Sequence, residues 1–324
     1  ENYAAGQDWR NRFLFLADDQ WSYLTFGGQY TKKGYESRFA EVCVDLSEQT
    51  AASPAGVDTT LLALHRYTDP YHGENTSGDQ QYAYETSLWV RENVTPDLMT
   101  MLSEGAAIFD FQGHGNKSLL THENVLRKAD LADIDNDGQP FIFIGFSCQL
   151  SRFHYWSEGT VGDCIVEDML HTSATGGAVA SYASSATELL TYNAIYNEKV
   201  FDAFFSEPTP AGDPAEFRWP RWALGGIFGK ATVDFVTDSI YPRPARTFIF
   251  FGDPLMHLET SPPAIHVTVD GETYVDEDYI GATGPGENAL LIADIIDEVE
   301  IDPSSISLVE SDVGTIDPSE YTLE

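Results

Sequence analysis

Two side chains that together can attack a carbonyl group follow apolar runs of the sequence. His114 lies between Gly113 and Gly115, directly after the run "IFDFQ". Cys148 lies 34 residues further on and follows the run "PFIFIGFS". A thiolate is the nucleophilic form of cysteine, and a neighbouring imidazole can take up the thiol proton. The two residues therefore suggest nucleophilic catalysis, provided that the fold brings them together.

Strand-like and helix-like segments alternate over most of the chain. Apolar runs predict strands at 12–18, 59–67, 106–112, 140–147, 176–184 and 246–254. Helical spacing and capping residues predict helices at 35–49, 95–105, 162–173, 191–205 and 221–238. This alternation indicates an α/β fold with a mostly parallel sheet flanked by helices. The carboxyl ends of neighbouring parallel strands share one edge, so we expect His114 and Cys148 at the same edge.

The glycines beside His114 give this edge a second property. Gly113 and Gly115 carry no side chain, so a substrate backbone can pass close to the chain there. A backbone amide at this position can join that of Cys148 in stabilising an oxyanion. The pattern thus favours acyl transfer to a cysteine nucleophile.

Five short motifs occur in a characteristic order. They are "FDFQGHGN", "PFIFIGFSCQLSRF", "GDCIVEDML", "GGAVASYASSAT" and "FIFFGDPLMHLET". In this order and approximate spacing the chain resembles the gingipain family of cysteine peptidases, from about residue 9 to 260. The resemblance implies a caspase-like fold for residues 1–260, followed by an immunoglobulin-like domain. It also implies protein or peptide substrates and a secreted or cell-surface location, although the first residues contain no apolar signal-peptide core.

The resemblance assigns roles to single residues. His114 corresponds to the catalytic histidine and Cys148 to the nucleophile, while the backbone amides of Gly115 and Cys148 correspond to the oxyanion hole. In related peptidases an acidic residue after the first strand approaches the histidine. Asp18 and Asp19 both follow the first predicted strand, and the sequence does not choose between them.

Other positions either match the family or depart from it. Cys164 aligns with a structural cysteine that opens a helix. The segment Thr187–Leu190 replaces an aromatic residue that the family can show near its specificity pocket. Cleavage after a basic residue is therefore expected only from the general resemblance to the gingipain family, and no single residue of this chain predicts it. The chain also corresponds to the second half of the family's catalytic region, so we expect the preceding N-terminal part to be missing.

Charge and composition limit the partners of the chain. Its 324 residues carry a formal net charge of −35, which disfavours nucleic acid and anionic membranes as partners. No apolar run approaches the length of a membrane span, and three cysteines make no disulfide framework. Residues 261–324 contain sixteen acidic residues, no Lys or Arg, and short alternating runs. We expect this segment to form a small antiparallel β-sandwich. The sequence carries no signal for an oligomeric state.

One loop has the opening pattern of a calcium site. Asp133, Asp135 and Asp137 in "DIDNDG" match the first positions of a calcium loop, but the distal glutamate of an EF-hand is absent. The same residues also suit a turn that needs no metal. The pair His122–Glu123 with His114 fits no compact zinc motif and is expected in a helix or loop. Thiol chemistry itself requires no cofactor, so calcium is expected only in a structural role.

Two function classes follow from these observations. The first is a cysteine endopeptidase that works through a Cys–His dyad and an acyl-enzyme. The alternative is a catalytically inactive surface or secretion-associated binding module of the same fold. The presence of both His114 and Cys148 favours the first class, because an inactive module has no reason to keep them. The missing N-terminal part and the acidic C-terminal segment favour the second.

Overall fold

The structure is a computed structural model. It describes residues 8–19, 21–26, 29–34, 36–52, 57–67, 80–136, 138–154, 156–157, 160–173, 175–205, 223–256, 258, 264–269, 272–273, 291–296, 309–310 and 314–315. The chain divides into two compact units, residues 1–260 and 261–324. The two units are described separately below.

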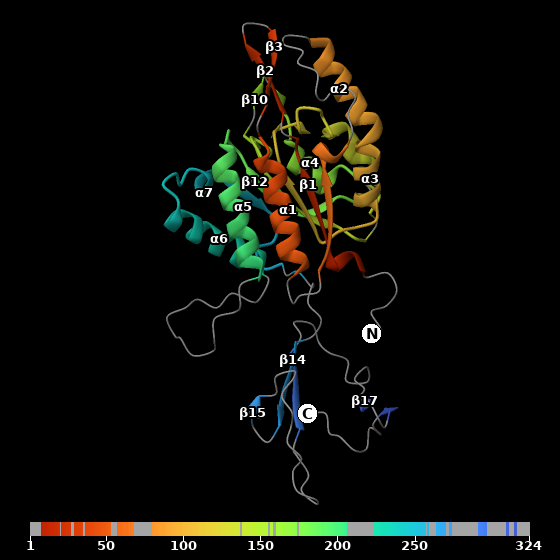
Figure 1. Ribbon diagram of the computed structural model, residues 1–324, viewed down its shortest axis with the longest axis vertical. Coiled ribbons are helices and arrows are strands. Elements are labelled where there is room, and N and C mark those ends of the chain that lie inside the picture. Colours follow the sequence, from red (N-terminus) through yellow and green to blue (C-terminus); the bar gives the residue numbers. More distant parts are fainter. Residues whose placement is uncertain are drawn as a thin grey trace, which may run out of the picture. The chain divides into compact units, whose positions relative to one another are not determined.

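The first unit is built around a six-stranded sheet (Figure 1). The strand order is β13-β12-β9-β5-β1-β4. Neighbouring strands run parallel, except that β13 is antiparallel to β12. The mostly parallel α/β arrangement predicted from the sequence is therefore confirmed. The bounds of these strands are β1 Arg12–Ala17, β4 Asp58–Ala63, β5 Ile108–Gln112, β9 Phe141–Phe146, β12 Ala178–Ser184 and β13 Phe248–Phe251.

Helices cover both faces of this sheet (Figure 1). Alternation along β1 explains the two layers: Phe13 and Phe15 belong to one buried cluster, while Leu14 and Leu16 belong to the other. The first cluster contains side chains from α1, α5 and α6, and the second contains side chains from α2, α3 and α4. The helices are α1 Arg38–Ala51, α2 Gln80–Asn93, α3 Thr95–Ser103, α4 Ile165–His171, α5 Leu190–Phe205 and α6 Leu224–Asp238. Within the described ranges, no helix is long and apolar enough to cross a bilayer.

Some elements differ from the sequence prediction. A hairpin of β2 (Trp21–Phe26) and β3 (Gln29–Gly34) follows β1 and was not predicted, and neither was α2. The segment 246–254, predicted as one strand, includes the end of a short helix, α7 (Pro244–Thr247), which precedes β13. Proline at the start of α7 explains this, because its fixed φ suits the first turn of a helix.

Short elements complete the first unit. They are the 3₁₀ segments Asp8–Asn11, Leu64–Arg66 and Lys128–Asp133, and the strands β6 Gly115–Asn116, β7 Leu119–Leu120, β8 Leu126–Arg127, β10 Trp156–Ser157 and β11 Thr160–Val161. Strands β6, β7 and β8 form a small antiparallel sheet directly after β5. The Pro-rich loop predicted at 206–220 lies outside the described residues.

In the second unit the described strands pair in an antiparallel manner. Strand β14 (Ala264–Val269) pairs with β16 (Leu291–Ile296) along its whole length and with β15 (Glu272–Thr273) at one end. Strands β17 (Val309–Glu310) and β18 (Gly314–Thr315) pair with each other. The remainder of the predicted β-sandwich lies outside the described residues.

Candidate active site

His114 and Cys148 leave the sheet at matching positions of two neighbouring strands. Gln112, the last residue of β5, lies opposite Phe146, the last residue of β9. His114 and Cys148 follow these two strand ends by two positions each. The ladder continues one step beyond the strands, since the Gly113 N–H donates to the Phe146 carbonyl at 3.3 Å. The parallel register therefore places both residues at the carboxyl edge, beside the point where the strand order reverses around β1.

Hydrogen bonds fix His114 from three sides. Its Nε2 lies 2.7 Å from Oε2 of Glu36, just before α1. Its backbone N–H donates to Oδ2 of Asp18 at 2.8 Å, and its carbonyl accepts from the Thr121 N–H at 2.8 Å. Asp18 therefore holds the main chain of the histidine, and Glu36 contacts the ring. Of the two carboxylates predicted after the first strand, Asp18 bonds to the main chain of His114, and the charges of both raise the pKa of the imidazole.

Aromatic rings pack against the imidazole on two sides. The ring of His122 is stacked on that of His114, with centroids 4.1 Å apart and an interplanar angle of 12°. Phe39 meets the His114 ring edge-on at 5.1 Å. These contacts leave little freedom of rotation to the imidazole. They also remove part of its surface from water.

The pKa values of the two histidines move in opposite directions. Burial alone lowers the pKa of His114, but the hydrogen bond to Glu36 and the charges of Asp18, Glu36 and Asp19 outweigh it, so the pKa is raised. Burial, together with the neighbouring His114, lowers the pKa of His122 to about 4. His122 is therefore neutral near pH 7. A neutral stacked ring lets His114 take up a proton without repulsion between two charged imidazoles.

Cys148 is half-buried, and its sulfur faces the backbone of Glu188. The Glu188 N–H donates to Sγ at 3.4 Å, and the thiol donates to the Glu188 carbonyl at 3.6 Å. Burial raises the pKa of the thiol and the charge of Glu188 adds to this, whereas the Glu188 N–H and the Arg243 guanidinium lower it. The net shift is upward, so the resting thiol is protonated and needs a base.

The loop from Ser184 to Glu188, which contacts Cys148, is anchored by a buried carboxylate. Oε1 of Glu188 accepts from the Ser184 hydroxyl at 3.0 Å and from the Thr247 hydroxyl at 2.6 Å. Gln149, the residue after Cys148, bonds to the same loop, since its N–H donates to the Ala186 carbonyl at 2.9 Å. Sequence position alone gave no sign of this role for Glu188.

The glycines flanking His114 lie in tight contact with neighbouring chain segments. A Cβ on Gly113 would come within 2.5 Å of Cβ of Asp18. A Cβ on Gly115 would come within 2.7 Å of Oγ of Ser147, the residue before Cys148. Only glycine fits these positions without a shift of the neighbours. The backbone of Gly115 therefore lies close to the turn that carries Cys148, as an oxyanion hole formed by both residues requires.

Left-handed backbone is concentrated at the same edge. Among the described residues other than glycine, positive φ occurs at Thr121 (60°), Asn124 (62°) and Gln149 (58°). Thr121 and Asn124 lie in the turn after β7, and Gln149 directly follows Cys148. A β-branched residue such as threonine rarely adopts this conformation.

Cys164, predicted to be structural, lies at the start of α4. It is fully buried and makes no disulfide. Its backbone N–H donates to Oε2 of Glu167, three residues later, at 2.8 Å. Burial and the hydrogen bond with Glu167 raise the pKa of its thiol to about 12. The Cys-x-x-Glu pattern of the sequence thus corresponds to a capped helix start.

The predicted calcium loop is held by its asparagine. Asp133 and Asp135 are exposed, and Asp137 lies outside the described residues. Asn136 is buried instead: its Oδ1 accepts from the Gly177 N–H at 2.6 Å, and its Nδ2 donates to the Gln139 carbonyl at 2.7 Å. The asparagine fixes this turn to the segment before β12 through hydrogen bonds.

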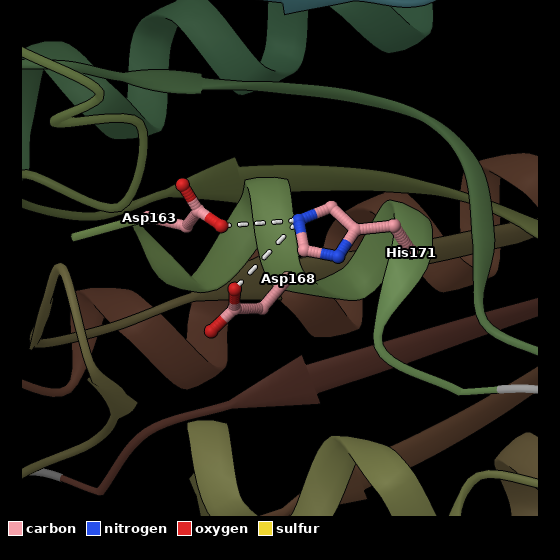
Figure 2. A group of neighbouring side chains, drawn as sticks. All are labelled: Asp163, Asp168 and His171. Atoms are coloured by element: carbon pink, nitrogen blue, oxygen red, sulfur yellow. Dashed lines mark ion pairs between the residues drawn. The ribbon is translucent and has the colours of Figure 1, made fainter. Parts of the chain in front are cut away.

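Figure 2 shows a cluster of ionisable groups at α4. Nε2 of His171 lies 3.3 Å from Oδ2 of Asp163 and 3.9 Å from Oδ1 of Asp168. Asp168 also pairs with Lys128, with Nζ and Oδ2 2.7 Å apart. Asp163 and His171 are exposed. Exposed contacts of this kind contribute little to stability.

Three functional candidates found in the structure were missed or dismissed in the sequence. Glu36 stands before a helix, where an acidic residue is usually a capping group. Glu123 lies in a turn, as expected of a helix or loop residue, but its complete burial was not predicted. Glu188 lies in the segment noted only as a departure from the family. One signal was available for Glu123, because it shares the dipeptide His122–Glu123 with the ring stacked on His114.

A family model and solved structures both show that the chain is similar to known peptidases. The model of peptidase family C25 matches residues 1–259. The chain is similar in fold to a complex of the pro- and mature domains of RgpB from Porphyromonas gingivalis, with 15% identity and a TM-score of 0.52. It is also similar to the Arg-specific cysteine proteinase gingipain R (RgpB), with 14% identity and the same TM-score. No curated protein sequence gives a match.

These likenesses cover the chains unequally. The aligned part makes up 83% of this chain in both cases, but only 54% and 52% of the respective RgpB chains. The chain thus spans about half the length of the solved structures that it matches.

Proposed function

The chain belongs to peptidase family C25, and on that premise we propose that it is a cysteine endopeptidase with Cys148 as nucleophile and His114 as base. The observation that carries this proposal is the matched register of the two residues after β5 and β9. The proposal is supported by the carboxylate bound to the imidazole and by the raised pKa of the thiol, which calls for a base. A general base beside a thiol is the arrangement that cysteine acyl transfer requires.

Acylation of the enzyme would begin with transfer of the Cys148 proton to His114. Because Nε2 is engaged by Glu36, the receiving atom is Nδ1. As the proton leaves, Sγ bonds to the peptide carbonyl carbon, and the carbonyl oxygen becomes an oxyanion. The amides of Gly115 and Cys148 donate to this oxyanion. The tetrahedral intermediate then expels the amine, which takes the proton from His114, and a thioester remains on Sγ.

Hydrolysis of the thioester would use the same groups in the reverse order. His114 accepts a proton from a water molecule whose oxygen attacks the thioester carbonyl. The carbon–sulfur bond breaks, the carboxylic acid leaves, and the proton returns to the Cys148 sulfur. Glu36 stabilises the imidazolium in both steps, since its carboxylate accepts from Nε2 at 2.7 Å.

The finer properties are also part of the proposal. We propose cleavage after a basic residue, supported by the fold shared with an Arg-specific proteinase and by the net charge of −35. We propose a secreted or cell-surface location on the same family grounds. The antiparallel pairs of residues 261–324 are compatible with the immunoglobulin-like sandwich expected there.

Thiol labelling tests the proposal directly. Peptidyl acyloxymethyl ketones with Arg, Lys, Asp or Asn before the warhead are applied, and the labelled residue is located by mass spectrometry. We expect fast labelling of Cys148 alone, with the Arg or Lys probe, and its loss in His114→Ala. Cys43 and Cys164 serve as internal controls, because both are buried. Labelling of Cys148 no faster than of these two thiols, with every probe, would refute catalysis and favour a binding module.

A further inference from the structure

The turn after β9 is bonded to the loop after β12 at two main-chain positions. The N–H of Gln149 donates to the Ala186 carbonyl, and the N–H of Ser151 donates to the Ser184 carbonyl, both at 2.9 Å. These bonds hold together two segments that are far apart in the sequence. The loop therefore stays beside Cys148, and side-chain contacts decide how its far end meets the sulfur.

The side chain of Gln149 makes a third connection between the two segments. Its Oε1 accepts from Nη1 of Arg152 at 3.1 Å, and its Nε2 donates to Oγ1 of Thr187 at 2.9 Å. A guanidinium group has donors only, so the bond to Arg152 requires the oxygen of the amide. The N–H groups of the amide are thereby directed to Thr187. The residue after Cys148 is thus bonded to a residue near the end of the loop.

The backbone of Gln149 has an unusual conformation. Its φ is 58°, in the left-handed region that few residues other than glycine adopt. Such a conformation persists only where the surrounding contacts determine it. Here hydrogen bonds engage the N–H, the carbonyl and both ends of the side-chain amide. Every polar group of this residue therefore helps to fix the turn directly after Cys148.

Thr187 passes this restraint on to the sulfur of Cys148. The N–H of the next residue, Glu188, donates to Sγ at 3.4 Å. This donor favours the charged sulfur and is one of the groups that lower the pKa of the Cys148 thiol. The same N–H belongs to the peptide group that joins Thr187 to Glu188. A displacement of Thr187 therefore moves the donor away from the sulfur.

We propose that Gln149 is a positioning residue for the nucleophile: through Thr187 it holds the Glu188 N–H against the Cys148 sulfur and so favours the thiolate. The inference rests on the proposed function, because it assigns a role within the same site. Gln149 acts only through its neighbours and takes no part in the bond changes. Its partner belongs to the segment Thr187–Leu190, where the sequence departs from the gingipain pattern. The connection is therefore a property of this chain rather than of the family pattern.

Alkylation of the thiol tests this role without any measurement of peptide hydrolysis. The folded full chain is treated with iodoacetamide, a small uncharged reagent, over a range of pH. The rate at each cysteine is then measured by mass spectrometry. The thiolate is the reacting form, so the pH profile for Cys148 reports the ionisation of its thiol. Cys43 and Cys164 are buried and serve as internal controls for the integrity of the fold.

Four variants separate the connection from a general effect of substitution. Gln149→Ala removes the amide, and Thr187→Val removes the hydroxyl that accepts from it. Thr187→Ser keeps that hydroxyl and is the conservative variant. Thr237→Val is the matched control, because Thr237 is an exposed threonine of α6 whose hydroxyl donates to the Val233 carbonyl at 2.8 Å.

We expect Gln149→Ala and Thr187→Val to slow the alkylation of Cys148 by about 2- to 13-fold below the pKa of its thiol, the effect of one lost hydrogen bond. Above that pKa the rates should equal that of the parent chain. Thr187→Ser and Thr237→Val should keep the parent profile throughout. The double variant Gln149→Ala/Thr187→Val should react no more slowly than either single variant, because both remove the same bond.

An unchanged profile in both Gln149→Ala and Thr187→Val would overturn the proposal. Slowing by one factor at every pH would also overturn it, since that result indicates altered access to the thiol and not altered ionisation. Thr187→Val decides the question alone if Gln149→Ala does not fold. A parent chain that cleaves no peptide would refute the proposed function, whereas the comparison of alkylation profiles would still decide the role of Gln149.

Discussion

Replacing Glu36 by glutamine tests how the carboxylate acts on His114. The substitution keeps the size of the side chain and a hydrogen-bonding oxygen, but removes the negative charge 2.7 Å from Nε2. Both side chains are about three-quarters buried, with exposed fractions of 23% for His114 and 26% for Glu36. A hydrogen bond to a charged partner in such a site contributes about 1.5–3 kcal/mol.

The expected change in rate follows from this free energy. In the proposed mechanism the imidazolium forms during acylation and deacylation, so the lost stabilisation appears in the transition state. A loss of about 1.5–3 kcal/mol corresponds to a decrease in kcat/KM of about 10- to 160-fold. The pH profile should shift as well. Glu36 is the largest influence that raises the pKa of His114, so its neutralisation lowers that pKa. The acidic limb of kcat/KM, where His114 loses its function by protonation, therefore moves to lower pH.

The assay is the pH dependence of kcat/KM on a peptide substrate selected by the labelling series. Glu41→Gln is the matched control, because Glu41 belongs to the first turn of α1 and accepts from the exposed Ser37 hydroxyl at 2.8 Å. We expect the control to keep both the rate and the acidic limb of the parent chain. An acidic limb in Glu36→Gln that coincides with that of the control would refute the assigned role of Glu36.

Three further substitutions probe other parts of the site and its support. Thr247→Val removes a 2.6 Å hydrogen bond to the buried Glu188. It should therefore lower the free energy of unfolding, measured in urea, by about 1.5–3 kcal/mol. An unchanged urea concentration at the unfolding midpoint would contradict this. Gly115→Ala should lower kcat by about 10²–10³-fold, because it displaces a backbone donor of the oxyanion hole. Gly162→Ala is the control and should keep the kcat of the parent chain, since a Cβ there meets no atom within 4 Å. Equal kcat values in the two variants would disprove the role of Gly115 in the oxyanion hole. Asp110→Asn tests how the protonation of this buried acid affects stability. Burial raises the pKa of Asp110 from 3.8 to about 7, so between these two pH values the folded chain binds more protons than the unfolded chain. The free energy of unfolding of the parent chain therefore falls as the pH rises through this range. The fall amounts to up to about 4 kcal/mol, and urea unfolding across this pH range should show it reduced in the variant.

The sequence predicted the sheet and the placement of the two central residues well. The strands ending before His114 and Cys148 are continuous apolar runs, and both β5 and β9 are fully buried. Parallel neighbours must end at one edge, so the position of both residues followed from local pattern alone. The helix α2 escaped detection because its apolar periodicity is weak: Val90 is buried, but aromatic and polar residues alternate irregularly before it.

The acidic residues of the site could not be predicted in the same way. Glu36 reaches the ring of His114 only after the chain has passed through the hairpin β2–β3, which the sequence did not reveal. Glu123 and Glu188 are buried against the general tendency of glutamate to be exposed. Their positions depend on contacts between segments that are far apart in the chain. Periodicity and motif spacing carry no information on such contacts.

The three left-handed residues at the carboxyl edge bear on how this protein would respond to selection. Thr121, Asn124 and Gln149 hold backbone conformations that cost of order 1–3 kcal/mol each, and the buried sheet must compensate for them. Variants chosen for heat resistance alone, for example with glycine at these positions, would relieve the strain and gain stability. They would do so by loosening the turns that carry the candidate chemistry. In this fold, a screen for thermostability would therefore enrich substitutions that weaken the site.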